Sequence, residues 1–193
     1  MENIYPIINN LIENLESPSS TPKNTNIILD GGGFNGLYQV GVLAYFNKLK
    51  ENGHIKINKI SGCSIGALCG MLYILSDLES GIEGFQIMRE SYKNTGCLIA
   101  ATKWVESYKT KMKKNDYIKL NGRLFVTYYN IKTCKQQCVS TFKNNKHLLN
   151  TVIKSMSLPF VYDGSIALKN KYLDGFTPYI FKDRDANTEN IFI

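Results

Sequence analysis

The first predicted element is a short amphipathic helix at the beginning of the chain. Apolar residues recur at helical spacing over residues 3–16, at Ile4, Ile7, Ile8, Leu11, Ile12 and Leu15. The polar face of this segment carries no Lys or Arg, which favours packing on the protein over insertion into a membrane. Residues 17–25 are rich in Ser and Pro and predict a loop. We therefore expect residues 1–25 to form a helix and linker ahead of one folded domain over residues 26–193.

Beyond residue 25, short apolar runs alternate with helical patterns. Strands are expected at residues 26–29, 55–61, 122–130, 135–142 and 171–173. Helices are expected at residues 36–52, from the turn at 62–66 to residue 78, and at 82–95, 98–114 and 145–156. The order strand, helix, strand, helix in the first half of this domain predicts an α/β fold, with parallel strands joined by right-handed crossovers.

Composition supports one ordinary globular domain. The chain has 193 residues, of which 44% are hydrophobic and 20% charged. No apolar run approaches the roughly 20 residues that span a bilayer, and Glu2 with the polar residues behind it does not resemble a secretory signal. The five cysteines are scattered, which favours reduced thiols in the cytoplasm. Cys134 and Cys138 have no nearby ligand partners, so we expect no metal site.

The chain is basic, with a formal net charge of +7. A positive charge suits nucleic acid, an anionic membrane surface or simple solubility. No zinc knuckle, basic arm or interleaved aromatic and basic pattern is present, so we expect no nucleic-acid partner. Peripheral contact with an anionic membrane and plain solubility both stay open.

The most specific motif is Gly62-x-Ser64-x-Gly66, which lies between a predicted strand and a predicted helix. This pattern is typical of a nucleophile elbow, in which a tight turn with small residues on both sides exposes the serine hydroxyl. The helix that follows offers backbone N–H groups, and the amide of Ile65 is a candidate for an oxyanion hole. Ser64 is therefore the candidate nucleophile.

A second motif is the glycine run at Gly31, Gly32 and Gly33. Consecutive glycines allow the backbone to approach a ligand and turn several N–H groups towards negative charge. With Gly36 the run also matches a dinucleotide-binding fingerprint, which needs an acidic residue near the end of the second strand. Here the second strand ends in Gly62-Cys63-Ser64, so a second oxyanion-stabilising loop is favoured.

A serine nucleophile needs a base, and the residues leave two candidates. Ser64, Asp116 and His147 form one formal triad, although His147 lies in a Lys/Asn-rich stretch that is typical of a solvated helix start. His54 lies in a turn before the second strand. The other candidate is Asp174, which ends a short predicted strand and precedes Gly175, and which would act on the serine directly.

Four segments, in the same order, resemble patatin-like phospholipases. Residues 30–43 resemble the oxyanion block of that family, and residues 62–67 its nucleophile block. Ser155-Met156-Ser157-Leu158-Pro159-Phe160 is similar to the segment ahead of the catalytic acid, and Asp174-Gly175 to the Asp-Gly block. The resemblance covers about residues 26–180. It implies a three-layer α/β/α fold with a mainly parallel central sheet, and a patatin-like catalytic domain over residues 26–193.

The resemblance also implies a Ser64–Asp174 dyad that cleaves fatty-acyl esters of phospholipids through an acyl-enzyme, without a cofactor. Amides of Gly31, Gly32, Gly33 and Ile65 would hold the oxyanion. Two departures bear on turnover: Asn35 stands where many members have a basic residue, and Phe176 where many have a small one. An acyltransferase or neutral lipase, and a non-catalytic lipid-binding protein on the same scaffold, therefore remain as alternatives.

Overall fold

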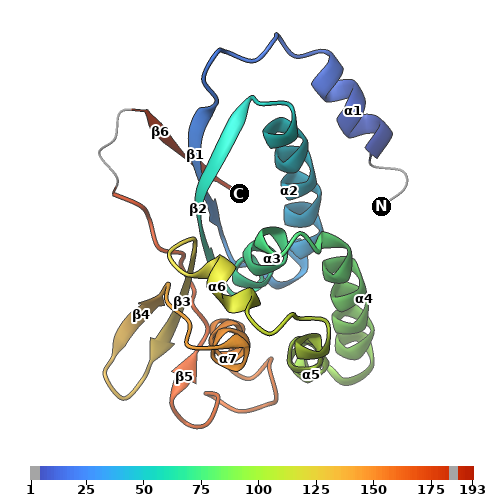
Figure 1. Ribbon diagram of the computed structural model, residues 1–193. Helices are drawn as coiled ribbons and strands as arrows, with labels where there is room; N and C mark the ends of the chain where they lie inside the picture. The colour runs from blue at the N-terminus through green and yellow to red at the C-terminus, as the bar shows by residue number, and fades with distance from the viewer. Residues whose placement is uncertain (1–4, 183–186) are drawn as a thin grey trace.

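The computed structural model describes residues 5–182 and 187–193, and it places a mainly parallel sheet among helices (Figure 1). The strand order is β4-β3-β2-β1-β6, and β5 pairs with β3 off this path. β1 pairs in parallel with both β2 and β6, and β2 pairs in parallel with β3. β4 and β5 are antiparallel to β3. The predicted α/β class with a mainly parallel sheet is confirmed.

The element bounds are as follows. The strands are β1 (Lys23–Leu29), β2 (Ile55–Cys63), β3 (Leu124–Asn130), β4 (Lys135–Val139), β5 (Tyr172–Leu173) and β6 (Thr188–Phe192). The helices are α1 (Tyr5–Glu13), α2 (Gly36–Glu51), α3 (Ile65–Ile74), α4 (Leu78–Thr95), α5 (Ile99–Ser107), α6 (Asp116–Leu120) and α7 (Asn145–Ser155). Short 3₁₀ turns lie at Gly33–Asn35 and Tyr108–Thr110. Among the described residues, no helix combines the length and hydropathy needed to cross a bilayer.

Strand β5 continues the line of β2 along the edge of β3. β2 pairs with β3 as far as Cys63 opposite Thr127, and then turns away into α3. β5 pairs with Tyr129 and Asn130, the last residues of β3. β4 occupies the other edge of β3 from Val126 to Asn130, so β5 must lie on the edge that β2 leaves. The residues that follow β5 therefore lie beside the end of β2.

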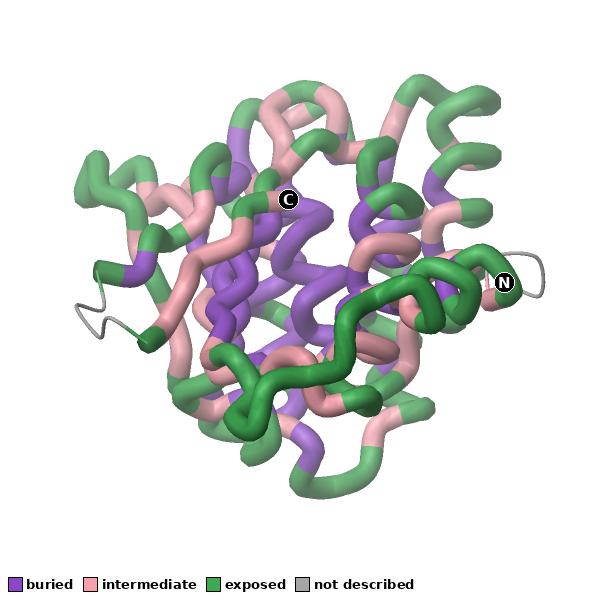
Figure 2. The backbone as a smooth tube through the Cα atoms, turned by 90° about the horizontal axis from the view of Figure 1, so that it is seen from above, coloured by how far each residue is buried: buried purple, intermediate pink, exposed green. Residues whose placement is uncertain are grey.

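The hydrophobic core lies between the sheet and helices α2, α3, α4, α5 and α7, where buried backbone is concentrated in the middle of the molecule (Figure 2). α3 is apolar on nearly every side and is buried from Ile65 to Tyr73. Trp104 and Tyr108, one helical turn apart, pack inward with ring centroids 5.7 Å apart. Gly84 on α4 admits the Trp104 ring, because a Cβ there would lie 2.9 Å from it. Both aromatics therefore belong to the core.

Several predicted elements have different bounds. The predicted helix over residues 98–114 is wrong as a single element: α5 ends at Ser107, and α6 begins at Asp116, whose carboxylate accepts the N–H of Lys113. β1 begins at Lys23, within the predicted loop, and α3 ends at Ile74 rather than at residue 78. The N-terminal helix covers Tyr5–Glu13, while residues 3 and 4 of the predicted span lie outside the described residues. β6 and α6 have no counterpart among the elements predicted from the sequence.

Removing a side-chain contact between β1 and β6 should lower the stability of the fold measurably. The side-chain amide of buried Asn26 donates to Asn190 Oδ1 at 3.0 Å, and Asn190 Nδ2 donates to the carbonyl of Phe181. Asn190→Ala removes both bonds and leaves a buried donor unpaired, so we expect the free energy of unfolding to fall by about 1–3 kcal/mol. Urea denaturation measures it. Asn150→Ala, at an exposed position of α7, is the control, and an equal loss there would contradict the assignment.

Candidate active site

Ser64 occupies a strained turn between β2 and α3. Its backbone has φ 52° and ψ −127°, a conformation that L-residues rarely adopt, and its side chain is 5% exposed. A Cβ on Gly62 would lie 2.5 Å from the Gly66 carbonyl, and a Cβ on Gly66 would lie 2.6 Å from the carbonyls of Leu29 and Asp30. Both glycines are therefore required by close backbone approach, and Ser64 lies in a tight turn between β2 and α3.

The glycine run after β1 lies against the elbow. Gly31 passes so close to Ser64 that a Cβ on Gly31 would lie 3.5 Å from the Cβ of Ser64. Gly32 and Gly33 have φ values of 121° and 50°, which suit glycine. The amide of Gly31 donates to Asp30 Oδ1 at 2.7 Å, and is thereby already engaged. The run thus turns sharply beside Ser64, with its first N–H held by the preceding carboxylate.

Two helices begin at this point and pack against each other. α2 starts at Gly36 and α3 at Ile65, and a Cβ on Gly36 would lie 2.6 Å from Ile65 Cγ1. The first N–H groups of a helix have no intrahelical acceptor, and they carry the positive end of the helix dipole. Two such ends beside one serine favour negative charge there.

Asp174 follows β5 and reaches the same point. Its side chain is 2% exposed, and Oδ1 accepts the N–H of Phe176 at 2.9 Å. Burial raises the pKa of this carboxyl, while the hydrogen bond from Phe176 and the nearby Ser64 hydroxyl act in the opposite direction. Oδ2 is buried and makes no hydrogen bond of standard geometry, so the Ser64 contact is a near approach rather than a formed bond. The carboxyl thus keeps one oxygen available to accept a proton.

Ser155, at the end of α7, links the two candidate catalytic residues, and the sequence analysis did not assign it a role. Its hydroxyl accepts the N–H of Ser64 at 2.8 Å and donates to the carbonyl of Thr127 at 2.6 Å. Its own carbonyl accepts the N–H of Gly175, while the carbonyl of Ser157 accepts that of Asp174. The only sequence signal was its place in the segment ahead of Pro159. Ser155 therefore fixes the backbone of both residues relative to β3.

The histidines and Asp116 are engaged elsewhere. His147 Nδ1 accepts the N–H of Lys143, and its ring packs on Phe142 at 6.2 Å. Asp116 accepts the N–H of Lys113 and pairs with Lys119. His54 lies in the turn before β2, where its carbonyl accepts the N–H of Lys23. None of these contacts involves Ser64, so the alternative triad has no support in the described structure.

An apolar pocket opens beside Ser64. Its wall combines Gly33, Ser64 and Ile65 with side chains from α4, α5 and the segment after α7: Met88, Leu98, Ala101, Thr102, Met156, Leu158 and Tyr162. A second apolar pocket shares Ile65, Met88, Ala101 and Met156, and reaches Leu72 and Trp104. Each encloses about 10 Å³, room for about one water molecule. Of the residues common to both pockets, Met88 and Met156 have the most flexible side chains.

Asn35 and Phe176, the two residues at which the chain differs from many patatin-like phospholipases, do not line the pocket at Ser64. Asn35 immediately precedes α2. Its side chain packs against Gly32, where an added Cβ would lie 2.7 Å from Asn35 Nδ2. Phe176 has φ 53° and is 48% exposed, and its ring packs against Tyr129. Its side chain does not line the pocket at Ser64, whereas its N–H binds Asp174. Among the described residues, no group of three or more His, Cys, Asp or Glu is placed to hold a metal ion.

The chain matches a known protein family. A family model described as "Patatin-like phospholipase" matches residues 27–177, which includes the glycine run, the elbow, Ser155 and Asp174. None of the curated proteins matches the chain.

The bridging role of Ser155 can be tested with its neighbour as control. Ser155→Ala leaves the N–H of Ser64 and the carbonyl of Thr127 without this partner, so we expect the free energy of unfolding to fall by about 1–3 kcal/mol. Because Ser64 would then be less well positioned, its labelling by a fluorophosphonate should slow by about tenfold to a hundredfold.

Ser157→Ala is the matched control, since the Ser157 hydroxyl is also buried but donates only to the carbonyl of Ile153 in the last turn of α7. Labelling rates of the two variants are compared with that of the wild type. Equal slowing in both would show that Ser155 has no special role at Ser64.

Proposed function

The chain belongs to the patatin-like phospholipase family, whose members are generally lipid acyl hydrolases, and we propose from this that Ser64 and Asp174 form its catalytic dyad. The observation that carries the proposal is the buried carboxyl of Asp174, which lies close enough to the strained Ser64 for the serine hydroxyl to lower its pKa and which has one oxygen without a hydrogen bond. A base must stand near the hydroxyl it activates, and no other carboxylate or imidazole of the described residues contacts Ser64.

In the proposed reaction, Ser64 Oγ attacks the carbonyl carbon of a fatty-acyl ester while Asp174 takes the proton of the Ser64 hydroxyl. The tetrahedral intermediate then expels the alcohol part of the lipid, which leaves with the proton that Asp174 held. The acyl group stays on Ser64. Water attacks this ester with Asp174 again as base, and the fatty acid is released while Ser64 regains its proton. The same acyl-enzyme would transfer its acyl group to another lipid if an alcohol replaced water.

We assign the oxyanion contacts to the amides of Gly32, Gly33 and Ile65. The amide of Ile65 is the first of α3, and Gly33 and Ile65 line the pocket beside Ser64. Gly31 was also a predicted oxyanion donor, but its N–H donates to the Asp30 carboxylate. We therefore assign Gly31 to shaping the loop rather than to binding the oxyanion. Amides held in place before the reaction stabilise the developing charge without reorganisation.

The apolar pockets behind Ser64 suit the acyl chain of the substrate. Their walls are aliphatic and aromatic, and the first opens at the nucleophile itself. Their enclosed volumes are too small for a fatty-acyl chain, so binding requires Met88 and Met156 to move aside. Unbranched Met side chains change rotamer at low cost, which makes this rearrangement feasible.

The dyad predicts which substitutions abolish hydrolysis. Ser64→Ala removes the nucleophile, and Asp174→Asn keeps the shape of the side chain but not its basicity. We expect Asp174→Asn to lower kcat for a phospholipid by about 10²–10⁴-fold. Fatty-acid release from a panel of phospholipid and neutral-lipid classes measures the effect.

His147→Ala is the control for those variants, and should leave hydrolysis nearly unchanged. Loss of activity in this control would mean that a histidine is the base. A wild-type protein that reacts with no fluorophosphonate at Ser64 would instead favour a lipid-binding protein without catalysis.

The burial of Asp174 predicts the acid side of the pH profile. Only the ionised carboxylate accepts the serine proton, and burial raises the pKa of Asp174 above its ordinary value of 3.8. As the pH falls through this raised pKa, kcat/KM should decrease, with its inflection above 3.8. Initial rates over an acidic pH series locate the inflection. An acid limb that disappears in His147→Ala would contradict the assignment to Asp174.

A further inference from the structure

A cluster of two lysines and two tyrosines lies on α7, β3, β5 and the residue before β5, outside the candidate active site. We call Tyr128, Lys154, Lys171 and Tyr172 the basic–aromatic cluster. Lys154 Nζ lies 5.0 Å from the ring centroid of Tyr128 and 4.4 Å from that of Tyr172. Lys171 Nζ lies 5.2 Å from the Tyr172 ring, and the two rings meet edge to face at 5.6 Å. Two ammonium groups thus converge on one tyrosine.

The positive charge of this cluster is not neutralised by carboxylates in the described part of the chain. The ion pairs found there use other lysines: Lys23, Lys48, Lys93, Lys111 and Lys119. Aromatic faces attract a cation but carry no net charge, so the ring contacts leave both lysines positive.

Two neighbouring groups respond to this charge. Burial alone would raise the pKa of Tyr172, but the ammonium groups of Lys171 and Lys154 outweigh it and lower that pKa. The pKa of His147 is lowered by burial and then by the charges of Lys154 and Lys143. The surface around Lys154 therefore has a positive potential that favours an anion.

We propose that the basic–aromatic cluster binds a phosphate group. The two ammonium groups supply charged N–H donors and the Tyr172 hydroxyl a third donor, which suits an anion with several oxygens. Lys154, Lys171 and Tyr172 are each partly exposed, so a ligand can reach them. The phosphate could belong to the headgroup of an anionic phospholipid or to a soluble phosphate. This binding does not depend on the chemistry proposed for Ser64.

The test uses Ser64→Ala protein, so that vesicles stay intact and binding is measured apart from hydrolysis. Co-sedimentation with vesicles of phosphatidylcholine, alone or mixed with phosphatidic acid, measures lipid binding, and calorimetric titration with inorganic phosphate measures soluble binding. In this background, Lys154→Gln/Lys171→Gln should weaken binding to the mixed vesicles by about fivefold per lysine, or about 25-fold in all. Tyr172→Phe, which keeps the ring, should weaken it less.

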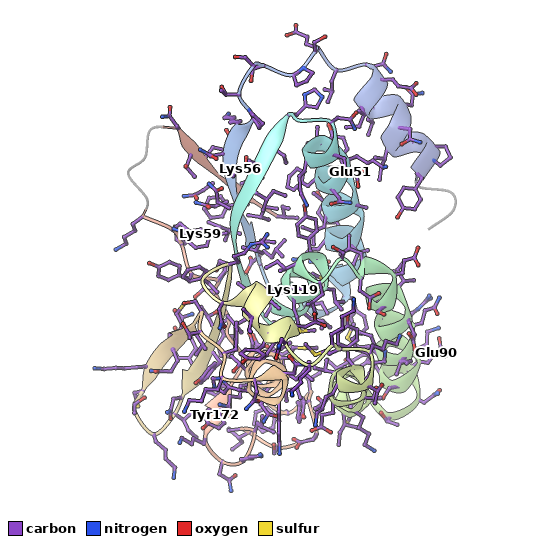
Figure 3. All side chains as sticks on the ribbon, in the orientation of Figure 1. Glu51, Lys56, Lys59, Glu90, Lys119 and Tyr172 are labelled. Carbon is purple, nitrogen blue, oxygen red and sulfur yellow. The ribbon has the colours of Figure 1, made fainter. Side chains whose placement is uncertain are left out.

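Lys50→Gln/Lys56→Gln is the charge-matched control. Both lysines are exposed, and Lys56 lies at the far end of the molecule from Tyr172 (Figure 3). Thermal melting checks that each variant is folded, and Lys171→Gln alone replaces the double variant if that one is not. Binding only to mixed vesicles assigns the site to a lipid headgroup, and binding to inorganic phosphate as well assigns it to phosphate in general. Equal losses in cluster and control, or no binding to either probe, would overturn the proposal.

Discussion

The edge of β3 is the constraint on which the arrangement of the site depends. β2 leaves this edge after Cys63, and β5 takes its place at Tyr129. The residue after β2 is Ser64 and the residue after β5 is Asp174, so two positions far apart in sequence meet where one strand replaces another. Ser155 secures the junction, because its hydroxyl bonds both Ser64 and β3 while its carbonyl binds Gly175. Gly175 allows the close approach, since a Cβ there would collide with the Thr127 carbonyl and with Cys63.

This junction departs from the rules that stabilise the rest of the fold. Ser64 has a strained backbone, Asp174 is buried with an unbonded oxygen, and burial raises its pKa. Because the folded state favours the protonated acid, the ionised carboxylate opposes folding at pH values above its raised pKa. Such local conflicts persist where surrounding structure imposes them, and they are concentrated at functional sites. Here the surrounding structure is the apolar core of α3 and the hydrogen bonds of Ser155.

Much of the site could be predicted from sequence because its signals are local. Gly62 is required by the backbone of Gly66, four residues on, and Gly32 and Gly33 by their positive φ values. Gly66 is crowded by the carbonyls of Leu29 and Asp30, far away in sequence, but the short spacing of the Gly-x-Ser-x-Gly motif is visible in the chain. Ser155 has no such signal, since its partner Ser64 is 91 positions away and the bond exists only once α7 packs on β3. β6 is a short strand whose partner β1 lies at the other end of the chain. α5 ends at Ser107 and a 3₁₀ turn follows at Tyr108–Thr110, whereas the lysine-rich residues 109–114 favour a continuing helix by composition alone.

The proposed chemistry and the proposed phosphate binding use the same two elements. On α7, Lys154 of the basic–aromatic cluster precedes Ser155, which positions Ser64. Before the Asp-Gly turn, Tyr172 of the cluster precedes Asp174 by two residues. Successive positions of a helix point in directions about 100° apart, so α7 can present Lys154 outward and Ser155 inward without additional structure. A buried dyad that works on lipid esters and an exposed site that binds phosphate would then share one rigid support.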